Sequence, residues 1–250
     1  MGTVNCPRQG KHPIRGKQNL RARLVGWFIN LQNRQMETNK PPFPRSMVYL
    51  AILVEGGLVL LAYPLSWLLG LSSPLGQFKP EWTPALAGLL GTLPLVPLFL
   101  LIVYFPIPLF EKLRGISRDV IRPMMEGCTM VDLIGISLLA GVGEEMVFRG
   151  ALQPWLAREF SPFTAIVLTA IAFGLLHALT LSYFILATFM GIYLGCLLVW
   201  TDNLLAPMMV HFLYDAFALI FLTRVWKPAE QKGEVSGDPF QEDEESEYDP

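Results

Sequence analysis

The chain has 250 residues and a formal net charge of −2 at pH 7, with 52% hydrophobic and only 16% charged residues. An average soluble protein has about 25% charged residues, so this composition excludes an ordinary soluble globular domain. Apolar runs of about 18 residues or more are typical of membrane helices. Residues 161–201 contain no Asp, Glu, Lys or Arg, and we therefore predict a multi-pass membrane protein.

Taken in chain order, the sequence divides into three parts of different charge. Residues 1–46 contain nine Lys or Arg and one acidic residue, which predicts a basic arm. Residues 47–226 contain the apolar runs and are expected to form the transmembrane core. Residues 227–250 contain nine Asp or Glu and two Lys, and an acidic tail of this kind is typically disordered.

Six transmembrane helices are predicted within the core, which gives an all-α bundle. They are expected at residues 48–71, 85–110, 131–155, 163–181, 183–201 and 204–226. The loop at 111–129 has four Lys or Arg, whereas the loop at 72–84 has one. Because positively charged loops stay in the cytosol, we expect the arm and the 111–129 loop there. An even number of spans then puts both the amino and the carboxyl terminus in the cytosol.

Titratable residues inside predicted spans are rare and usually mark function. Here three spans carry polar groups, which are Glu144, Glu145 and Arg149; Phe173 with His177; and His211 with Asp215. Each group has a structural explanation when taken alone, such as an ion pair between spans or a hydrogen-bonded core histidine. Their joint occurrence on three spans favours one polar pocket with a function.

Helical spacing indicates how these groups would be arranged. Residues four apart share a helix face, so Glu145 and Arg149 are expected to form a structural ion pair that leaves Glu144 on a neighbouring face. Straight spans would put Glu144 about 20 Å and His177 about 6 Å from the cytosolic end, a mismatch that tilt or different span ends would have to remove. Small residues near the glutamates allow another helix to approach closely; they are Gly141, Gly143 and Gly150.

The chemistry that such a pocket supports is the activation of water. Glu144 can accept a proton from water, and His177 can hold the same water molecule. His211 can stabilise the oxyanion that forms when the water attacks a carbonyl group. General-base catalysis and oxyanion stabilisation are two large contributions to the rate of hydrolysis.

The ordered motifs E-E-x-x-x-R at 144–149, F-x-x-x-H at 173–177 and H-x-x-x-D at 211–215 resemble those of the CAAX-protease and bacteriocin-processing family. The resemblance covers roughly residues 130–220 and implies an intramembrane glutamic endopeptidase that needs no cofactor or essential metal. It implies that Glu144 and His177 activate water and that His211 and Asp215 form the oxyanion site. Glu145, in the first motif, is a further catalytic candidate. The family often has Asn at the last position, so Asp215 is either protonated or serves to charge His211.

Other functions stay open at this point. Glu144, His177 and His211 could be ligands of a zinc ion, although the sequence contains no HExxH motif. Intramembrane Glu and His also serve as proton or ion relays in transporters, and an idle relative could act as a scaffold or immunity protein. As partners we expect a peptide or protein substrate and the lipid bilayer, and no nucleic acid. The sequence does not indicate the substrate, its prenylation or the oligomeric state.

Overall fold

A computed structural model describes residues 46–227, and every regular element in that range is a helix. The predictions for the basic arm and the acidic tail therefore lie outside the described residues, except at their innermost positions. The elements are α2 (Ser46–Leu68), α3 (Trp82–Thr92), α4 (Leu95–Tyr104), α5 (Pro108–Ile116), η1 (Ser117–Ile121), α6 (Arg122–Met125), α7 (Met130–Val147), η2 (Phe148–Leu152), α8 (Gln153–Glu159), α9 (Pro162–Leu176), α10 (Leu181–Thr201), α11 (Leu205–Ile220) and η3 (Phe221–Val225). The elements η1, η2 and η3 are π-helical turns. The predicted all-α class is confirmed.

The number of spans differs from the six that were predicted. Within residues 46–227, four helical segments are long and apolar enough to cross a membrane: Val48–Leu68, Trp82–Tyr104, Leu181–Thr201 and Leu205–Val225. A fifth is added if Phe110–Met125 and Met130–Glu159, which meet at 116°, count as one broken span. The predicted loop at 111–129 is thus largely helical. The predicted span at 163–181 is α9, whose 15 residues fall short of the roughly 20 that a span needs.

Local capping explains where two of these helices begin. α7 begins with a capping box, in which the Thr129 hydroxyl accepts from the Asp132 amide and the Asp132 carboxylate accepts from the Thr129 amide. α10 begins at a Thr180 N-cap, whose hydroxyl accepts from the Tyr183 amide. Since threonine is a favoured N-cap residue, a new helix starts at 181. The apolar run from 163 to 201 is therefore divided by a turn at residues 177–180.

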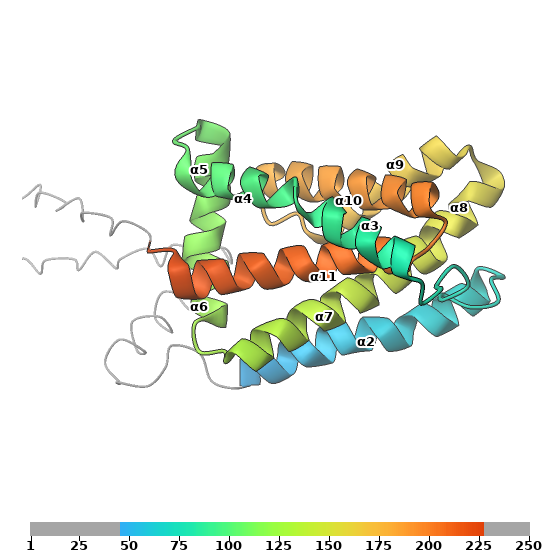
Figure 1. Ribbon diagram of the computed structural model, residues 1–250, viewed down its shortest axis with the longest axis horizontal. Helices are drawn as coiled ribbons and strands as arrows, with labels where there is room; N and C mark the ends of the chain where they lie inside the picture. The colour runs from blue at the N-terminus through green and yellow to red at the C-terminus, as the bar shows by residue number, and fades with distance from the viewer. Residues whose placement is uncertain (1–45, 228–250) are drawn as a thin grey trace, which may run out of the picture.

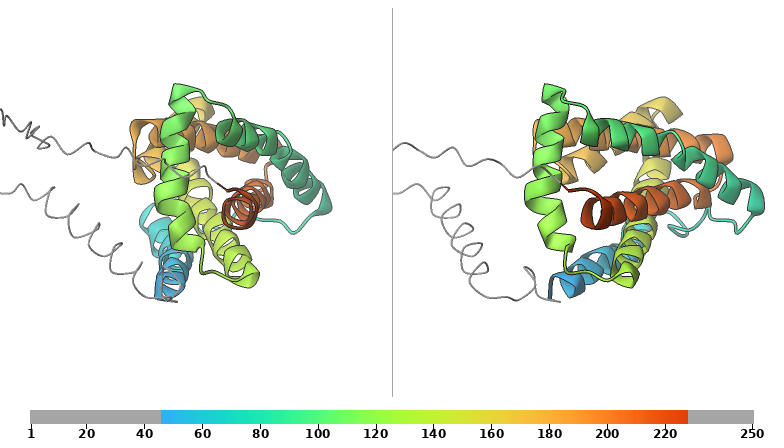
Figure 2. Two further views of the ribbon diagram at one scale, coloured as in Figure 1. Left: turned by 90° about the vertical axis from the view of Figure 1, so that its left-hand side faces the viewer. Right: turned by 60° about the vertical axis from the view of Figure 1, so that its left-hand side comes forward.

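The long helices run side by side along the longest dimension of the molecule, as Figures 1 and 2 show. α7 packs between α2 and α11, and α10 packs against α9. The helix formed by α5, η1 and α6 stands across one end of this bundle. The described chain ends, at residues 46 and 227, lie at the same end of the molecule as this crossing helix. Both chain ends therefore leave the bundle on one side.

Two glycines let α7 approach its neighbours closely in the turn before Glu144. A Cβ atom on Gly143 would lie 2.7 Å from the Glu55 carbonyl oxygen of α2. A Cβ atom on Gly141 would lie 2.8 Å from the Phe212 nitrogen of α11. Because real Cβ atoms do not approach backbone atoms this closely, a larger residue at either position would push the helices apart.

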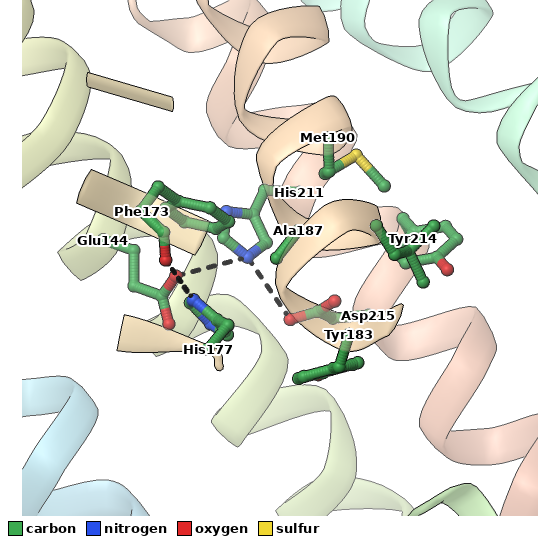
Figure 3. Close-up of a pocket in the computed structure, with 10 residues that line it drawn as sticks. Glu144, Phe173, His177, Tyr183, Ala187, Met190, His211, Tyr214 and Asp215 are labelled. Atoms are coloured by element: carbon green, nitrogen blue, oxygen red, sulfur yellow. Dashed lines mark hydrogen bonds and ion pairs between the residues drawn. The ribbon is translucent and has the colours of Figure 1, made fainter. Parts of the chain in front are cut away.

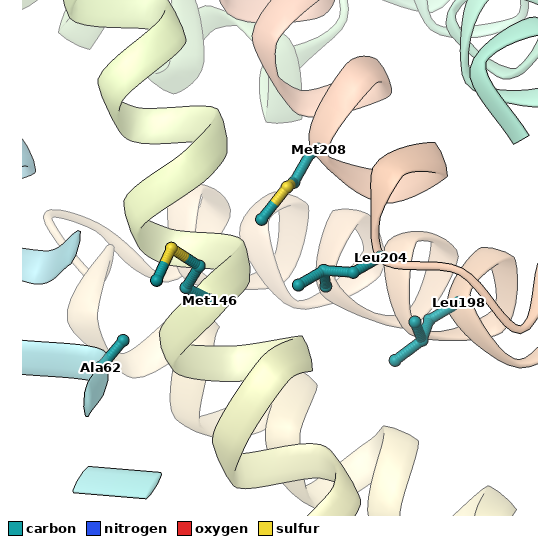
Figure 4. Close-up of a cluster of buried hydrophobic side chains, with 5 residues drawn as sticks. All are labelled: Ala62, Met146, Leu198, Leu204 and Met208. Carbon is teal, nitrogen blue, oxygen red and sulfur yellow. The ribbon is translucent and has the colours of Figure 1, made fainter. Parts of the chain in front are cut away.

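A buried apolar cluster fixes the same helices just beyond the glutamates. Its side chains come from α2, α7, α10, α11 and the turn before α11, and they meet in the interior (Figure 4): Ala62, Met146, Leu198, Leu204 and Met208. Met146 directly follows the two glutamates in the sequence. Close packing of Met146 therefore holds the turn of α7 that carries the two glutamates.

We expect Gly143→Ala to lower the stability of the protein, because overpacking of this kind typically costs about 1–3 kcal/mol. Gly135→Ala on the same helix is the matched control, since a Cβ there has no described atom within 4 Å. It should leave stability unchanged or raise it slightly, because alanine is the better helix former. Thermal unfolding of the two variants in detergent checks this. Equal midpoints would contradict the close contact of α7 with α2.

Candidate active site

The three polar groups of the sequence come together between α7, α9 and α11. Figure 3 shows Glu144, His177, His211 and Asp215 pointing toward one another. The Oε2 atom of Glu144 lies 3.7 Å from Nε2 of His177 and 3.8 Å from Nε2 of His211. The Oδ2 atom of Asp215 lies 3.5 Å from the same Nε2 of His211. Two imidazoles and two carboxylates thus face a common point.

Glu145 is the buried residue that joins two of these groups. Its Oε1 atom accepts a hydrogen bond of 2.8 Å from Nη1 of Arg149 and lies 2.9 Å from Nδ1 of His211. The side chains of Glu145 and Arg149 are both 0% exposed. An ionised carboxylate only accepts hydrogen bonds, so Nδ1 of His211 is the donor. Sequence spacing predicted the contact with Arg149, but not the contact with His211, which is 66 residues away.

A π-helical turn places Arg149 where it can reach three partners. The turn η2 follows directly on α7, and such π-bulges are frequent at functional sites. Besides Glu145, Arg149 donates through Nη2 to the Gly191 carbonyl of α10 at 3.0 Å. Its guanidinium carbon also lies 4.7 Å from the ring centroid of Phe173 on α9. One arginine therefore links α7, α9 and α10 around the buried Glu145.

Phe173 serves as the surface against which the two histidines are placed. The His177 ring stacks on it with centroids 4.5 Å apart and planes at 29°. The His211 ring is T-shaped to the Phe173 ring, with centroids 6.0 Å apart and planes at 74°. In addition, Nδ1 of His177 donates to the Phe173 carbonyl oxygen at 2.8 Å. This bond assigns the proton to Nδ1, so Nε2 of the neutral ring faces Glu144 with its lone pair.

A pocket of about 130 Å³ opens at the point where these polar atoms meet. Glu144 itself is 8% exposed, and its Oε2 atom has no hydrogen-bond partner among the described residues. A buried acceptor of this kind is costly unless a ligand or water satisfies it. The pocket is lined by Glu144, Phe173, His177, Tyr183, Leu186, Ala187, Met190, His211, Tyr214 and Asp215.

Sequence reasoning missed three residues around this pocket. Tyr183 and Tyr214 line it, but tyrosines in apolar helices are too common to attract attention. Glu55 of α2 was also overlooked. It interacts electrostatically with His211 and Asp215, and its Oε2 atom is buried without a hydrogen-bond partner in the described part of the chain. The signal was available, because Glu55 is the single charged residue of α2, and a lone charge in a span usually has a function.

A zinc ion needs three or four ligands grouped around it. Among residues 46–227, no three His, Cys, Asp or Glu side chains are grouped in a way that could hold a metal ion. The set Glu144, His177 and His211 that was considered for zinc is part of this range.

Fold and site together define a class of protein. It is an integral membrane protein with buried carboxylates and imidazoles in a common pocket. The family model described as "Type II CAAX prenyl endopeptidase Rce1-like" matches residues 127–217. This range contains all three motifs and confirms the resemblance that they indicated, so residues 127–217 are similar to the Rce1-like family. No solved structure matches the chain.

A similar protein is known in Bacillus subtilis (strain 168), under the name "Uncharacterized protein YpbD". The two sequences are 33% identical over 116 residues, which are 45% of this chain and 54% of the Bacillus protein. The match thus spans about half the length of this curated relative. Its name gives no activity, so the likeness extends the family resemblance without adding a function.

Arg149→Ala should destabilise the protein far more than Glu144→Gln does. Removing Arg149 leaves the fully buried Glu145 without its cation, and breaking a buried pair typically costs about 3–5 kcal/mol. Glu144→Gln keeps the size and polarity of a side chain that has no ion-pair partner closer than 3.7 Å. The yield of folded protein and its thermal midpoint in detergent measure the difference. Similar midpoints for the two variants would argue against a structural role of the pair.

Glu55→Gln should raise the thermal midpoint. An unpartnered buried charge costs more than an unpartnered neutral polar group, which costs about 1–3 kcal/mol, and for a chain of this size one kcal/mol shifts the midpoint by about 2–4 °C. Glutamine removes the charge and keeps the shape of the side chain. The exposed Glu81 provides the control, since Glu81→Gln should change nothing. A lower midpoint for Glu55→Gln would show that the carboxylate has a stabilising partner.

Proposed function

We propose that the protein is an intramembrane endopeptidase that hydrolyses peptide bonds near the membrane by means of a water molecule held between Glu144 and His177. The observation that carries this proposal is the unpartnered Oε2 atom of Glu144 in the pocket, with an imidazole nitrogen at 3.7 Å and another at 3.8 Å. These separations are too long for direct hydrogen bonds but suit one bridging water. The family match over residues 127–217 supports the same activity.

In this mechanism Glu144 is the general base. It takes a proton from the water while Nε2 of His177, whose ring is held by the Phe173 carbonyl, accepts the second hydrogen and orients the oxygen. The water oxygen then bonds to the scissile carbonyl carbon, and negative charge collects on the carbonyl oxygen. Glu144 afterwards gives its proton to the nitrogen of the leaving amine as the carbon–nitrogen bond breaks.

His211 is the donor to the developing oxyanion. Its Nδ1–H is engaged by Glu145, so the Nε2–H of the charged ring is free to point into the pocket. A preorganised donor of this kind typically contributes a factor of about 10²–10³ to the rate. Asp215, at 3.5 Å from Nε2, maintains the positive charge of the ring. Glu145 and Asp215 thus act through His211, and Arg149 compensates the charge of Glu145.

Substrate, membrane orientation and cofactor needs belong to the same proposal. The substrate is a peptide or protein at the membrane, because the pocket lies within a bundle of apolar helices. Both termini are placed in the cytosol, in keeping with the basic residues expected there and with the common exit side of the described chain ends (Figure 1). Hydrolysis proceeds through side chains alone and requires no metal or other cofactor.

Glu144→Gln is expected to reduce hydrolysis by a factor of about 10²–10⁴, because glutamine cannot accept the proton. The purified protein is incubated with a solubilised membrane fraction, and new peptide amino termini are identified by labelling and mass spectrometry. Glu111→Gln makes the same chemical change at an exposed position of α5 and should retain full activity.

A parallel incubation with a chelator tests the metal-free mechanism. Activity should persist when divalent ions are removed. Cleavage by Glu144→Gln within a few-fold of the wild-type rate would exclude Glu144 as the base, and loss of activity with the chelator would favour a metal enzyme instead.

A further inference from the structure

The pocket has few hydrogen-bond donors for the negative charge that the proposed hydrolysis would create on the carbonyl oxygen. Among the side chains that line it, the possible donors are two histidines and two tyrosines: His177, His211, Tyr183 and Tyr214. The Nδ1–H group of His177 is engaged by the Phe173 carbonyl oxygen, and that of His211 is engaged by Glu145. The donors that remain are Nε2–H of the charged His211 ring and the two tyrosine hydroxyl groups.

Asp215 cannot supply a donor while it is ionised, because a carboxylate only accepts hydrogen bonds. Its Oδ2 atom lies 3.5 Å from Nε2 of His211, whereas Oε2 of Glu144 lies 3.8 Å from the same nitrogen. Asp215 therefore attracts the N–H group that the oxyanion needs, and it adds a negative charge beside the oxyanion. A second, neutral donor near Asp215 would offset both effects.

Tyr183 of α10 is placed where such a donor is needed. In Figure 3 it lies directly below Asp215, and it is close enough to both Asp215 and Glu144 to interact with them electrostatically. Its ring centroid lies 6.3 Å from that of His177. The Tyr183 hydroxyl has no hydrogen-bond partner among the described residues, so it is available to a group that enters the pocket.

The backbone that carries Tyr183 is fixed by the start of α10. The Thr180 hydroxyl accepts from the Tyr183 amide at 3.2 Å, and the Thr180 carbonyl oxygen accepts from the Phe184 amide at 2.9 Å. The neighbouring Ser182 is buried, with 6% of its surface exposed. The cap that begins the helix therefore also holds the tyrosine in place beside the pocket, as preorganised donation requires.

Tyr214 is less well placed for the same role. Its ring packs edge-on against Phe99 of α4, with centroids 6.2 Å apart and planes at 85°. Figure 3 shows its oxygen on the side away from Glu144. Its electrostatic partners are Asp215 and Tyr183, whereas those of Tyr183 include Glu144. Of the two tyrosines, Tyr183 is therefore the one that lies near the reacting atoms.

We propose that Tyr183 is a further catalytic residue, whose hydroxyl group donates a second hydrogen bond to the oxyanion beside that of His211. This inference rests on the proposed function and adds a catalytic group to it. The tyrosine keeps its proton throughout and acts only as a neutral donor. It supplies at this place the hydrogen bond that an asparagine at position 215 could give through its amide group, and that an ionised Asp215 cannot give.

Tyr183→Phe keeps the ring and removes only the hydroxyl, and the test uses a synthetic peptide built on a cleavage site from the membrane-fraction experiment. The kcat value should fall by a factor of about 10²–10³, as is typical when one oxyanion donor is lost, while KM stays within a few-fold. Tyr63→Phe makes the same change on α2, where the side chain is 48% exposed, and should keep full activity. Tyr214→Phe should lose much less activity than Tyr183→Phe.

A double-mutant cycle with Asp215→Asn distinguishes donation from a structural role. In the Asp215→Asn background the asparagine amide can replace the missing donor, so Tyr183→Phe should lower kcat by a much smaller factor than it does in the wild type. If Tyr183 only supported the fold, the two losses would be equal, as for independent sites. The thermal midpoint of Tyr183→Phe should match that of the wild type, because the hydroxyl has no partner in the described part of the chain.

A peptide phosphonamidate of the same sequence provides a second measurement that does not require turnover. Its charged phosphoryl oxygen stands in for the oxyanion, and analogues of a transition state lose affinity when a transition-state interaction is removed. Its inhibition constant for Tyr183→Phe should rise by about the factor by which kcat/KM falls. This measurement decides the matter if Asp215→Asn is too slow for the cycle.

The outcomes separate this inference from the proposed function. If the wild type cleaves the peptide and Glu144→Gln does not, but Tyr183→Phe stays within a few-fold of the wild type, the inference is wrong and the proposed function stands. The same holds if the two losses in the cycle are equal, if the phosphonamidate binds Tyr183→Phe unchanged, or if Tyr214→Phe causes the larger loss. If the wild type generates no new termini, or if Glu144→Gln generates the same ones, the proposed function fails and the role of Tyr183 fails with it.

Discussion

One oxygen atom, Oε1 of Glu145, connects the helices on which the rest of the site depends. It receives Arg149 from the turn after its own helix and His211 from α11. Arg149 in turn reaches the Gly191 carbonyl and the Phe173 ring. The helices α7, α9, α10 and α11 are thereby connected through a single buried carboxylate. In an apolar surrounding such an ion pair is expensive to assemble but very costly to break, so it fixes the orientation of His211 more firmly than a surface contact could.

The same surroundings explain why so many carboxylates are kept in one place. Glu55, Glu144 and Glu145 each have a buried carboxylate oxygen without a hydrogen-bond partner among the described residues. Groups of this kind lower stability, and proteins usually tolerate them where function requires them. The apolar clusters on either side, such as that around Met146 and Leu204, offset this cost. The site thus combines destabilising buried carboxylates with closely packed apolar surroundings that stabilise the fold.

Sequence patterns sufficed for what depends on spacing along one helix. The pair Glu145–Arg149 and the proximity of Phe173 to His177 both follow from a separation of four residues. Contacts between helices, such as that of Glu145 with His211, have no such signature. The end of α9 was misplaced because apolarity alone does not reveal a cap, and here Thr180 starts a new helix. Glu55 was missed although it is the lone charge of α2, because the groups that it faces, His211 and Asp215 on α11, are far away in the sequence.

The short α9 bears on where in the membrane the proposed reaction would take place. Its exposed turn at 178 and 179 interrupts the helix, and irregular backbone is not found facing hydrocarbon, so we expect the turn at the level of water and headgroups. His177 directly precedes that turn, and the pocket residues of α10 end at Met190, nine residues after Leu181, or about 14 Å along the helix. With the turn at that level, we expect the pocket to be hydrated from one side of the bilayer. The proposed hydrolysis would consume a water molecule in each cycle, and the helix break next to the histidine would then provide its supply.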